Sequence, residues 1–527
     1  MEKYVDHKNL MIVFVLSAFM CIFGIWGVPL LDPDEPVYAE TAREMIQFGD
    51  FLSPRIFNEY WYDKPPMYYW LVAICQFIFG YSEFAARLPA ALAAVGTAVV
   101  VYIGVTGVIH EKAGFWSALV LTSCIQFFYL GKAAVTDTTL LFFMTSALLC
   151  FWQKQYWPMY VFMALGTLTK GPIGIVFPGA IIILYLLASG ELYELTRMHF
   201  IRGILLYLLI CAPWYYAMYT VHGMVFIETF LGFHNLTRFT TPEHASRVTF
   251  WYYFPVVVLG LFPWTGLWLK SVKDSILDSR IDDMQKLWFP HIWAIFVFLF
   301  FTVCKTKLVS YILPMFPAMA IVIGWNISRM IQKHRHNTTY YSWIFSSVIL
   351  ITLLGVGWMV APNYLTDMPE AGELSVAGLI LGLLTLTIGL GFAFVMYSYR
   401  DVELGAWLHV LLGGVTMFVA FTFILPILSD RFSVKSMVQA YKANHDTEAT
   451  IYVDKFLRPG FMYYCGKPGK ELLPNTGDLS TALKNNEYKY LLVRGLEYRR
   501  VQRMQEIPAN VRIAENIGDI LLLVQNE

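Results

Sequence analysis

Long apolar runs fill the chain from about residue 10 to residue 425. A helix that crosses a bilayer needs about 20 consecutive apolar residues, so the pattern predicts thirteen spanning helices. They are expected at about 10–30, 85–108, 113–131, 136–152, 156–169, 172–188, 202–220, 251–269, 287–303, 308–328, 341–361, 375–397 and 403–425. One further run, 66–80, is short and ends in Gly80. We expect this run to lie on the membrane surface.

Basic residues set the predicted orientation. Cytoplasmic loops of membrane proteins carry an excess of Lys and Arg. When 66–80 is placed on the surface, seven segments with most of these residues fall on one side: the N-terminus, His110–Lys112, Gln153–Gln155, Glu191–Arg202, Lys270–Lys286, Arg329–His336 and Tyr399–Val402. The sequence therefore predicts a cytoplasmic N-terminus and an extracytoplasmic C-terminus.

The first outer segment, 31–84, is predicted to contain two surface helices. The first covers about 36–48, with Asp32 or Asp34 as its N-cap, Pro36 in its first turn and Gly49 at its end. The second is the run 66–80, which follows a Lys-Pro-Pro break.

The last hundred residues differ in composition. They are polar and contain short β-like runs at Ala449–Val453, Tyr488–Val493 and Asp519–Val524. A helical stretch at Ser433–Asn444 precedes these runs, and another at Glu497–Met504 lies between the last two. The predicted fold class is an all-α polytopic membrane protein with a small C-terminal α/β domain. We place the membrane domain at residues 1–429 and the extracytoplasmic α/β domain at residues 430–527.

Composition narrows the function classes. Hydrophobic residues make up 57% of the 527 residues and charged residues only 14%, whereas soluble proteins are about 25% charged. The 38 basic residues are balanced by 38 acidic ones, so no excess of positive charge points to nucleic acid. These values exclude a cytosolic enzyme, a disordered protein and a nucleic-acid binder.

Basic residues on the predicted outer side are the strongest chemical signal, because charge beside lipid is costly unless it is paired or hydrated. They are Arg43, Arg55, Lys64, Arg87, Lys132, Lys170, Arg238, Arg247, Lys305 and Lys307. Several lie in very short turns, where they can surround one cavity. Such a cluster predicts an anionic ligand, most simply a phosphate group. Ordinary surface charge is the alternative for each residue alone.

Outer carboxylates are the candidates for acid–base chemistry. Asp34 and Glu35 lie in LDPDEP, Asp63 in WYDKPP and Asp137 in AVTDTTL. Each can act as a general base or orient a substrate, and Asp34 and Asp137 can equally be helix caps. His222, His234 and His244 share one outer loop, but their spacing matches no zinc motif. We therefore expect no required cofactor, and a divalent metal is an alternative that the spacing does not support.

Several motifs carry a family resemblance over about residues 10–325. They are LDPDEPVYAETAREMIQFGDFLSP, YWYDKPPMYYWLVAICQFIFG, FAARLPAAL, VTDTTLLFF, LGTLTKGPIG, HNLTRF with FWYYFPVVVLGLFPW, and KTKLVSYILPMFPAMA. In these the chain resembles the bacterial glycosyltransferases related to the lipid A aminoarabinose transferase. Those enzymes belong to the wider superfamily of protein O-mannosyltransferases, which have the GT-C fold.

The resemblance implies a glycosyltransferase of the bacterial inner membrane. Its donor would be a polyprenyl-phosphate-linked sugar, and its acceptor a lipid, glycan or protein. The motifs match Asp34, Glu35 and Asp137 as catalytic candidates. They match Asp63, Lys64, Lys170, Arg238, Lys307 and Tyr311 as substrate-binding candidates, and Arg43 joins these from the outer cations.

Three departures from the aminoarabinose transferases leave the sugar and the acceptor open: Val37 before Tyr38, Ser246–Thr249, and Val309. A transporter or flippase of a lipid-linked sugar is the alternative function. Transporters typically have internal repeats and charge near the bilayer midplane. Here the charge lies at the predicted outer surface and no repeat is found, so the sequence favours an enzyme.

Overall fold

The computed structural model describes residues 5–230, 232, 249–277, 284–333, 338–365, 368–473, 476–484, 488–504 and 506–525. The chain forms two compact units, and neither is continuous in sequence. Unit 1 contains Met1–Phe23, Tyr62–Tyr68 and Pro89–Val419, and unit 2 contains Gly24–Trp61, Tyr69–Leu88 and Ala420–Glu527.

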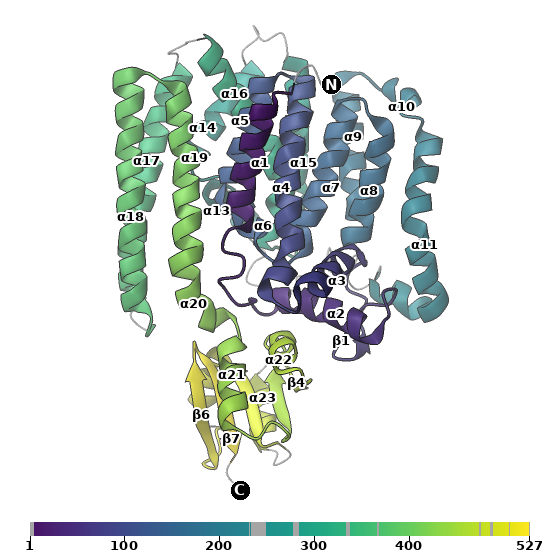
Figure 1. Cartoon of the computed structure of the whole chain (residues 1–527), viewed down its shortest axis with the longest axis vertical. Helices are drawn as coiled ribbons and strands as arrows, with labels where there is room; N and C mark the ends of the chain where they lie inside the picture. Colours follow the sequence, from purple (N-terminus) through teal and green to yellow (C-terminus); the bar gives the residue numbers. More distant parts are fainter. Residues whose placement is uncertain are drawn as a thin grey trace. The chain divides into compact units, whose positions relative to one another are not determined.

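Unit 1 is built from helices, most of which run alongside one another (Figure 1). They are α1 (His7–Ile22), α4 (Glu83–Val108, from Pro89 onward), α5 (Glu111–Ser123), α6 (Ile125–Gly131), α7 (Thr136–Trp152), α8 (Tyr156–Lys170), α9 (Ile173–Ser189), α10 (Glu194–Arg197), α11 (Phe200–Ile227), η3 (Phe250–Tyr252), α13 (Tyr253–Gly260), α14 (Thr265–Leu277), α15 (Met284–Val303), η4 (Val309–Met315), α16 (Phe316–Lys333), α17 (Thr338–Val360), η5 (Ala361–Tyr364), α18 (Ala371–Phe394), η6 (Val395–Tyr399) and α19 (Val402–Val419).

Every run predicted to span the membrane contains a helix. Among the described residues, seven helices are long and apolar enough to cross a bilayer, or up to nine if each bent pair is one span. The count of thirteen therefore stays a prediction. Shorter apolar helices, including α1, α7 and α9, account for part of the difference.

Two runs predicted as single helices are broken. The run 113–131 bends by 69° between α5 and α6, and the run 251–269 bends by 106° between α13 and α14. At the second break, Pro263 restricts the preceding Phe262 away from helical geometry. At the first break, the N–H of Ile125 donates to the carbonyl of Phe262 at 3.2 Å, so the two breaks are hydrogen-bonded to each other.

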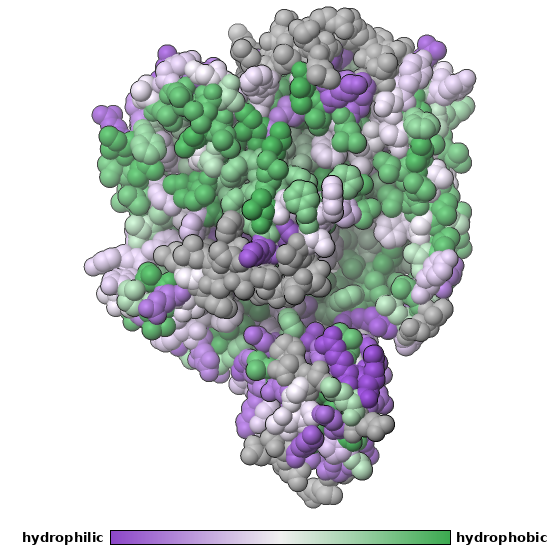
Figure 2. Space-filling model, turned by 180° about the vertical axis from the view of Figure 1, so that it is seen from behind, coloured by the Kyte–Doolittle hydropathy of each residue, from purple (hydrophilic) through white to green (hydrophobic). Residues whose placement is uncertain are grey.

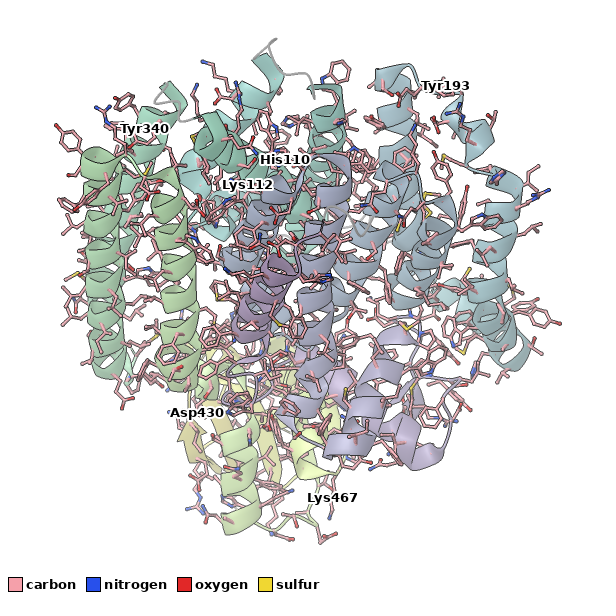
Figure 3. The ribbon with its side chains drawn as sticks, turned by 45° about the horizontal axis from the view of Figure 1, so that its top comes forward. His110, Lys112, Tyr193, Tyr340, Asp430 and Lys467 are labelled. Carbon is pink, nitrogen blue, oxygen red and sulfur yellow. The ribbon has the colours of Figure 1, made fainter. Side chains whose placement is uncertain are left out.

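The surface of unit 1 fits a membrane protein. Figure 2 shows a broad band of hydrophobic side chains over its helices, with hydrophilic side chains toward the ends. His110, Lys112, Tyr193 and Tyr340 lie toward the same end of these helices (Figure 3). The first three belong to or adjoin loops that the basic residues predict on one side, and this grouping agrees with the predicted topology. Which end of the helices faces the cytoplasm stays a prediction.

Unit 2 joins the first outer segment to the tail. Its elements are α2 (Asp34–Phe48), β1 (Arg55–Ile56), β2 (Glu59–Tyr60), α3 (Met67–Phe79, from Tyr69 onward), η7 (Ala420–Ile424), α20 (Leu425–Phe432), α21 (Lys435–Asn444), β3 (Ile451–Asp454), α22 (Arg458–Cys465), β4 (Lys470–Leu472), α23 (Thr476–Lys484), β5 (Tyr490–Arg494), α24 (Gly495–Arg503), β6 (Val511–Ile517) and β7 (Ile520–Gln525). The predicted domain boundary between residues 429 and 430 stays a prediction.

Both predicted helices of the outer segment form, and α2 ends at Gly49, whose φ of 63° suits glycine. The predicted N-cap is wrong. Pro33 holds the cap position without a side-chain hydrogen bond, and Asp34 is the first residue of the helix. Asp32 instead binds backbone N–H groups of the tail, as described below.

The tail forms a five-stranded mixed sheet in the order β4-β3-β5-β7-β6. Strands β4, β3 and β5 are parallel, whereas β7 is antiparallel to both β5 and β6. Alternate residues of β5 and β7 enter two hydrophobic clusters, with Leu492 and Leu522 in one and Leu491 and Leu523 in the other. The three predicted strands and the α/β character of the tail are thus confirmed.

Candidate active site

A cavity of about 250 Å³ in unit 1 combines charged and apolar walls. Its charged and polar lining includes Asp63, Lys64, Asp137, Lys170 and Tyr311, five of the residues predicted from sequence. Its apolar lining includes Leu140, Ile173, Val176, Phe177, Phe300 and Phe301. The cavity therefore suits a ligand with a charged group and an apolar chain.

Lys170 and Asp137 form the ion pair at this cavity that joins two helices. Lys170 lies in the last turn of α8 and Asp137 in the first turn of α7. Each charge is at the helix end that the helix dipole favours. The Nζ of Lys170 donates to Oδ1 of Asp137 at 2.8 Å, and it lies 5.1 Å from the ring centre of Tyr311.

A second pair comes from the segment Tyr62–Tyr68. The Nζ of Lys64 donates to Oδ1 of Asp63 at 2.9 Å. The four side chains of the two pairs are between 12% and 15% exposed. Low exposure strengthens electrostatic interactions, so the two partly buried ammonium groups can bind a phosphate strongly. When no phosphate is bound, the two carboxylates neutralise the charge of the two lysines.

Lys307 is placed differently from the prediction. Its Nζ donates to the carbonyls of Phe301 at 3.1 Å, Thr302 at 2.5 Å and Cys304 at 2.8 Å. It thus satisfies carbonyls at the C-terminal end of α15, and burial lowers the pKa of its ammonium group. Lys307 is not among the residues that line the cavity. Its contacts give it a structural role beside the site, and a contact with substrate stays a prediction.

Glu35 lies in unit 2, in a buried ion pair with Arg87. The Nε of Arg87 donates to Oε1 of Glu35 at 2.8 Å and its Nη2 to Oε2 at 2.5 Å. The N–H of Leu31 also donates to Glu35, at 2.7 Å. These contacts show Glu35 in a structural pair that fixes the first turn of α2.

Arg43 and Asp34 also lie in unit 2. Arg43 is buried, and its Nη2 donates to Oε1 of Glu40 at 2.7 Å. Its other bonds go to the C-terminal end of α22. Asp34, by contrast, is exposed in the first turn of α2.

Arg238 lies outside the described residues, as do His234 and His244. The Nδ1 of His222 is 3.0 Å from the hydroxyl of Tyr62. In the part of the chain that the structure describes, no three His, Cys, Asp or Glu residues form a group that could hold a metal. The expectation that no metal is needed stays a prediction.

The apolar lining of the cavity and the ion pair between Glu35 and Arg87 were not predicted from the sequence. Phe177, Phe300 and Phe301 stand in ordinary spanning runs, and no local pattern marks them. A signal did exist for Arg87, because an arginine near the start of a spanning helix requires a partner. Glu35, in the preceding outer segment, was an available carboxylate.

A family model described as dolichyl-phosphate-mannose-protein mannosyltransferase matches residues 63–216. This range includes Asp63, Lys64, Asp137 and Lys170. An uncharacterized protein of Aquifex aeolicus is 33% identical over 66% of this chain and 78% of its own length. The undecaprenyl phosphate-alpha-4-amino-4-deoxy-L-arabinose arabinosyl transferase of Edwardsiella ictaluri is 26% identical over 80% of this chain and 77% of its own length.

The crystal structure of ArnT from Cupriavidus metallidurans bound to undecaprenyl phosphate matches with a TM-score of 0.79. The match covers 98% of both chains at 20% identity. The chain belongs to the family of aminoarabinose and protein mannosyl transferases. It is therefore a membrane glycosyltransferase, and the family resemblance drawn from the sequence is confirmed. The structural match shows that this glycosyltransferase has the same fold as ArnT.

Proposed function

We propose that this glycosyltransferase moves a sugar from a polyprenyl-phosphate-linked donor to a lipid, glycan or protein acceptor at the extracytoplasmic face of the bacterial inner membrane. The observation that carries the proposal is the cavity of unit 1, where Lys64 and Lys170 stand against an apolar wall. A polyprenyl phosphate has the matching chemistry, since it combines one anionic group with a long apolar chain.

In the proposed complex, the polyprenyl chain of the sugar donor lies along Phe177, Phe300 and Phe301, and the phosphate of the sugar donor binds Lys64 and Lys170. Hydrogen bonds between an ammonium group and a phosphate are charge-assisted and stronger than neutral ones. The phosphate competes with Asp63 and Asp137 for the ammonium groups of these two lysines. Before the sugar donor binds, the two carboxylates keep the lysines in place.

The reaction breaks the bond between the anomeric carbon and the phosphate oxygen, and it forms a bond from the acceptor oxygen to that carbon. Negative charge accumulates on the leaving phosphate, and fixed cations stabilise this charge in the transition state. A phosphate leaving group needs no general acid. We assign Asp34 as the base that accepts the proton of an acceptor hydroxyl, and direct displacement inverts the anomeric centre.

Transfer of labelled sugar in proteoliposomes tests this proposal. Loss of one charge-assisted hydrogen bond removes about 1.5–3 kcal/mol, which corresponds to at least about a tenfold lower rate. We expect that loss in Lys170→Ala and in Lys64→Ala. The control is Lys154→Ala, because the side chain of Lys154 is 60% exposed and pairs with Glu194. Near-wild-type transfer in both cavity variants would rule out this phosphate site.

The same assay separates transfer from transport. A new glycosidic product identifies an enzyme, whereas relocation of the intact donor across the bilayer identifies a flippase. Relatives named as arabinosyl transferases favour the enzyme.

A further inference from the structure

Helix α22 of unit 2 is held at both of its ends by the first outer segment. It covers Arg458–Cys465 and follows β3, at the carboxyl end of that strand. Figure 1 shows it beside α21 in the C-terminal domain. A helix leaves N–H groups unsatisfied at its start and carbonyls unsatisfied at its end. In α22, groups at both ends are satisfied by residues about 400 positions earlier in the chain.

Asp32 binds the N-terminal end. Its Oδ1 accepts the N–H of Gly460 at 3.1 Å, and its Oδ2 accepts the N–H of Val434, just before α21, at 2.9 Å. One carboxylate thus joins the first turns of two helices of the tail. Burial raises the pKa of Asp32 well above its usual value, and the hydrogen bonds from these two N–H groups oppose that shift.

Arg43 binds the C-terminal end. Its Nη1 donates to the carbonyl of Tyr463 at 2.9 Å, and its Nη2 donates to the carbonyl of Met462 at 3.2 Å. The guanidinium carbon lies 5.5 Å from the ring centre of Tyr463. A positive charge is the charge that this end of the helix favours.

Further polar contacts surround this arrangement. The hydroxyl of Tyr464 accepts the N–H of Leu30 at 2.8 Å and donates to Glu83 at 3.1 Å. Lys435, at the start of α21, pairs with the same Glu83 at 2.6 Å. The tail therefore contacts the outer segment both before and after α2.

We propose that α22 is the docking element through which the C-terminal domain fixes α2, and that Asp32 and Arg43 are positioning residues for sugar transfer. Asp32 is two residues before Asp34, and Arg43 is on α2 itself. Together they set where α2 begins and how it is oriented within unit 2. The docking rests on contacts within unit 2, whereas its effect on catalysis rests on the proposed function.

Gly460 gives a sharp test, because a Cβ at this position would lie 2.3 Å from Oδ1 of Asp32. Alanine normally stabilises a helix relative to glycine. If α22 were only a helix of the tail, Gly460→Ala would be neutral or stabilising. If α22 docks onto Asp32, the same substitution displaces the carboxylate and loosens α2.

Amide hydrogen exchange of the full-length protein in detergent measures this effect. In Gly460→Ala we expect amides of α2 and α22 to exchange at least ten times faster than in the wild type, while β5 and β7 keep their rates. In an Asp32→Ala background the added methyl group meets no carboxylate, so Gly460→Ala should add no further acceleration. The matched control is Gly391→Ala in α18, where a Cβ meets nothing within 4 Å.

Three results would overturn the docking: wild-type exchange of α2 in Gly460→Ala, a full additional effect in the double variant, or equal acceleration in β5 and β7. The last would mean a general loss of the tail's fold. For the role in catalysis, we expect Gly460→Ala to lower kcat while KM for the donor stays unchanged. An unchanged kcat would refute the positioning role. If the wild type transfers no sugar, the proposed function fails, and the exchange rates still decide the docking.

Discussion

Lys170 donates a hydrogen bond of 2.8 Å to Asp137 and so joins the last turn of α8 to the first turn of α7. Both charges line the cavity of unit 1, where Lys64 and Asp63 form a second pair. Under the proposed function, an incoming phosphate competes with a carboxylate for each lysine. This competition has a measurable consequence.

We expect Asp137→Asn and Lys170→Ala to change the affinity for polyprenyl phosphate in opposite directions. Lys170→Ala should weaken binding at least about tenfold because it removes a charge-assisted donor. Asp137→Asn should strengthen binding several-fold because it removes the competing anion. Binding of labelled undecaprenyl phosphate to the purified protein measures both. If both variants bind more weakly, the placement of Lys170 by Asp137 outweighs the competition of Asp137 with the phosphate.

Lys307→Met should reduce the thermal stability of unit 1. The substitution leaves three carbonyls at the end of α15 without their ammonium donor. An unsatisfied buried polar group costs about 1–3 kcal/mol. Lys305→Met is the matched control, because Lys305 is exposed two residues away. An unchanged melting midpoint in Lys307→Met would argue against the structural role.

Asp34 and Glu35 are adjacent, yet we expect their substitutions to act differently. Glu35→Ala leaves Arg87 without its buried partner, and breaking such a pair costs about 3–5 kcal/mol. Asp34→Asn changes an exposed side chain, so the melting midpoint should stay near the wild-type value while transfer falls. Equal loss of stability in both variants would contradict this separation of roles.

The stability of unit 2 should depend on pH, with Glu40 as one contributor beside Asp32 and Glu44, whose pKa values burial also raises. Burial raises the pKa of Glu40 from 4.5 to about 7, although Arg43 opposes the shift. The folded state then binds a proton that the unfolded state has released, so the free energy of unfolding falls as pH rises from about 4.5 to 7. Hydrogen exchange of α2 between pH 5 and pH 8 measures this slope.

Glu40→Gln should reduce the slope, because an amide does not titrate in this range. Glu448→Gln, at an exposed pair with Lys467, should leave the slope as it is. The same slope in Glu40→Gln and the wild type would assign the pH dependence to another group.

Much of the architecture could be predicted because local patterns determine it. Apolar runs predicted the helices of unit 1, and short β-like runs predicted three strands of the tail. The motifs also placed Asp63, Lys64, Asp137, Lys170 and Tyr311 at one cavity. Short turns at helix ends leave little freedom for a charged side chain.

The contacts that could not be predicted are the distant ones. Besides Glu40 in its own helix, Arg43 binds two backbone carbonyls of α22, and such carbonyls have no signature in the sequence. For Asp32, a helix cap was the nearest explanation, and the N–H groups that it binds lie far along the chain. The helix breaks near Cys124 and Phe262 likewise depend on each other across unit 1.

The discontinuity of unit 2 has a consequence for how the protein is made. Asp32 and Val434, which it binds, are 402 residues apart. At about 5–20 residues per second, a ribosome that has incorporated Asp32 needs about 20–80 s to reach Val434. During that interval Asp32 has neither of its partners in the tail, so unit 2 can complete its folding only after Val434 and Gly460 have been made.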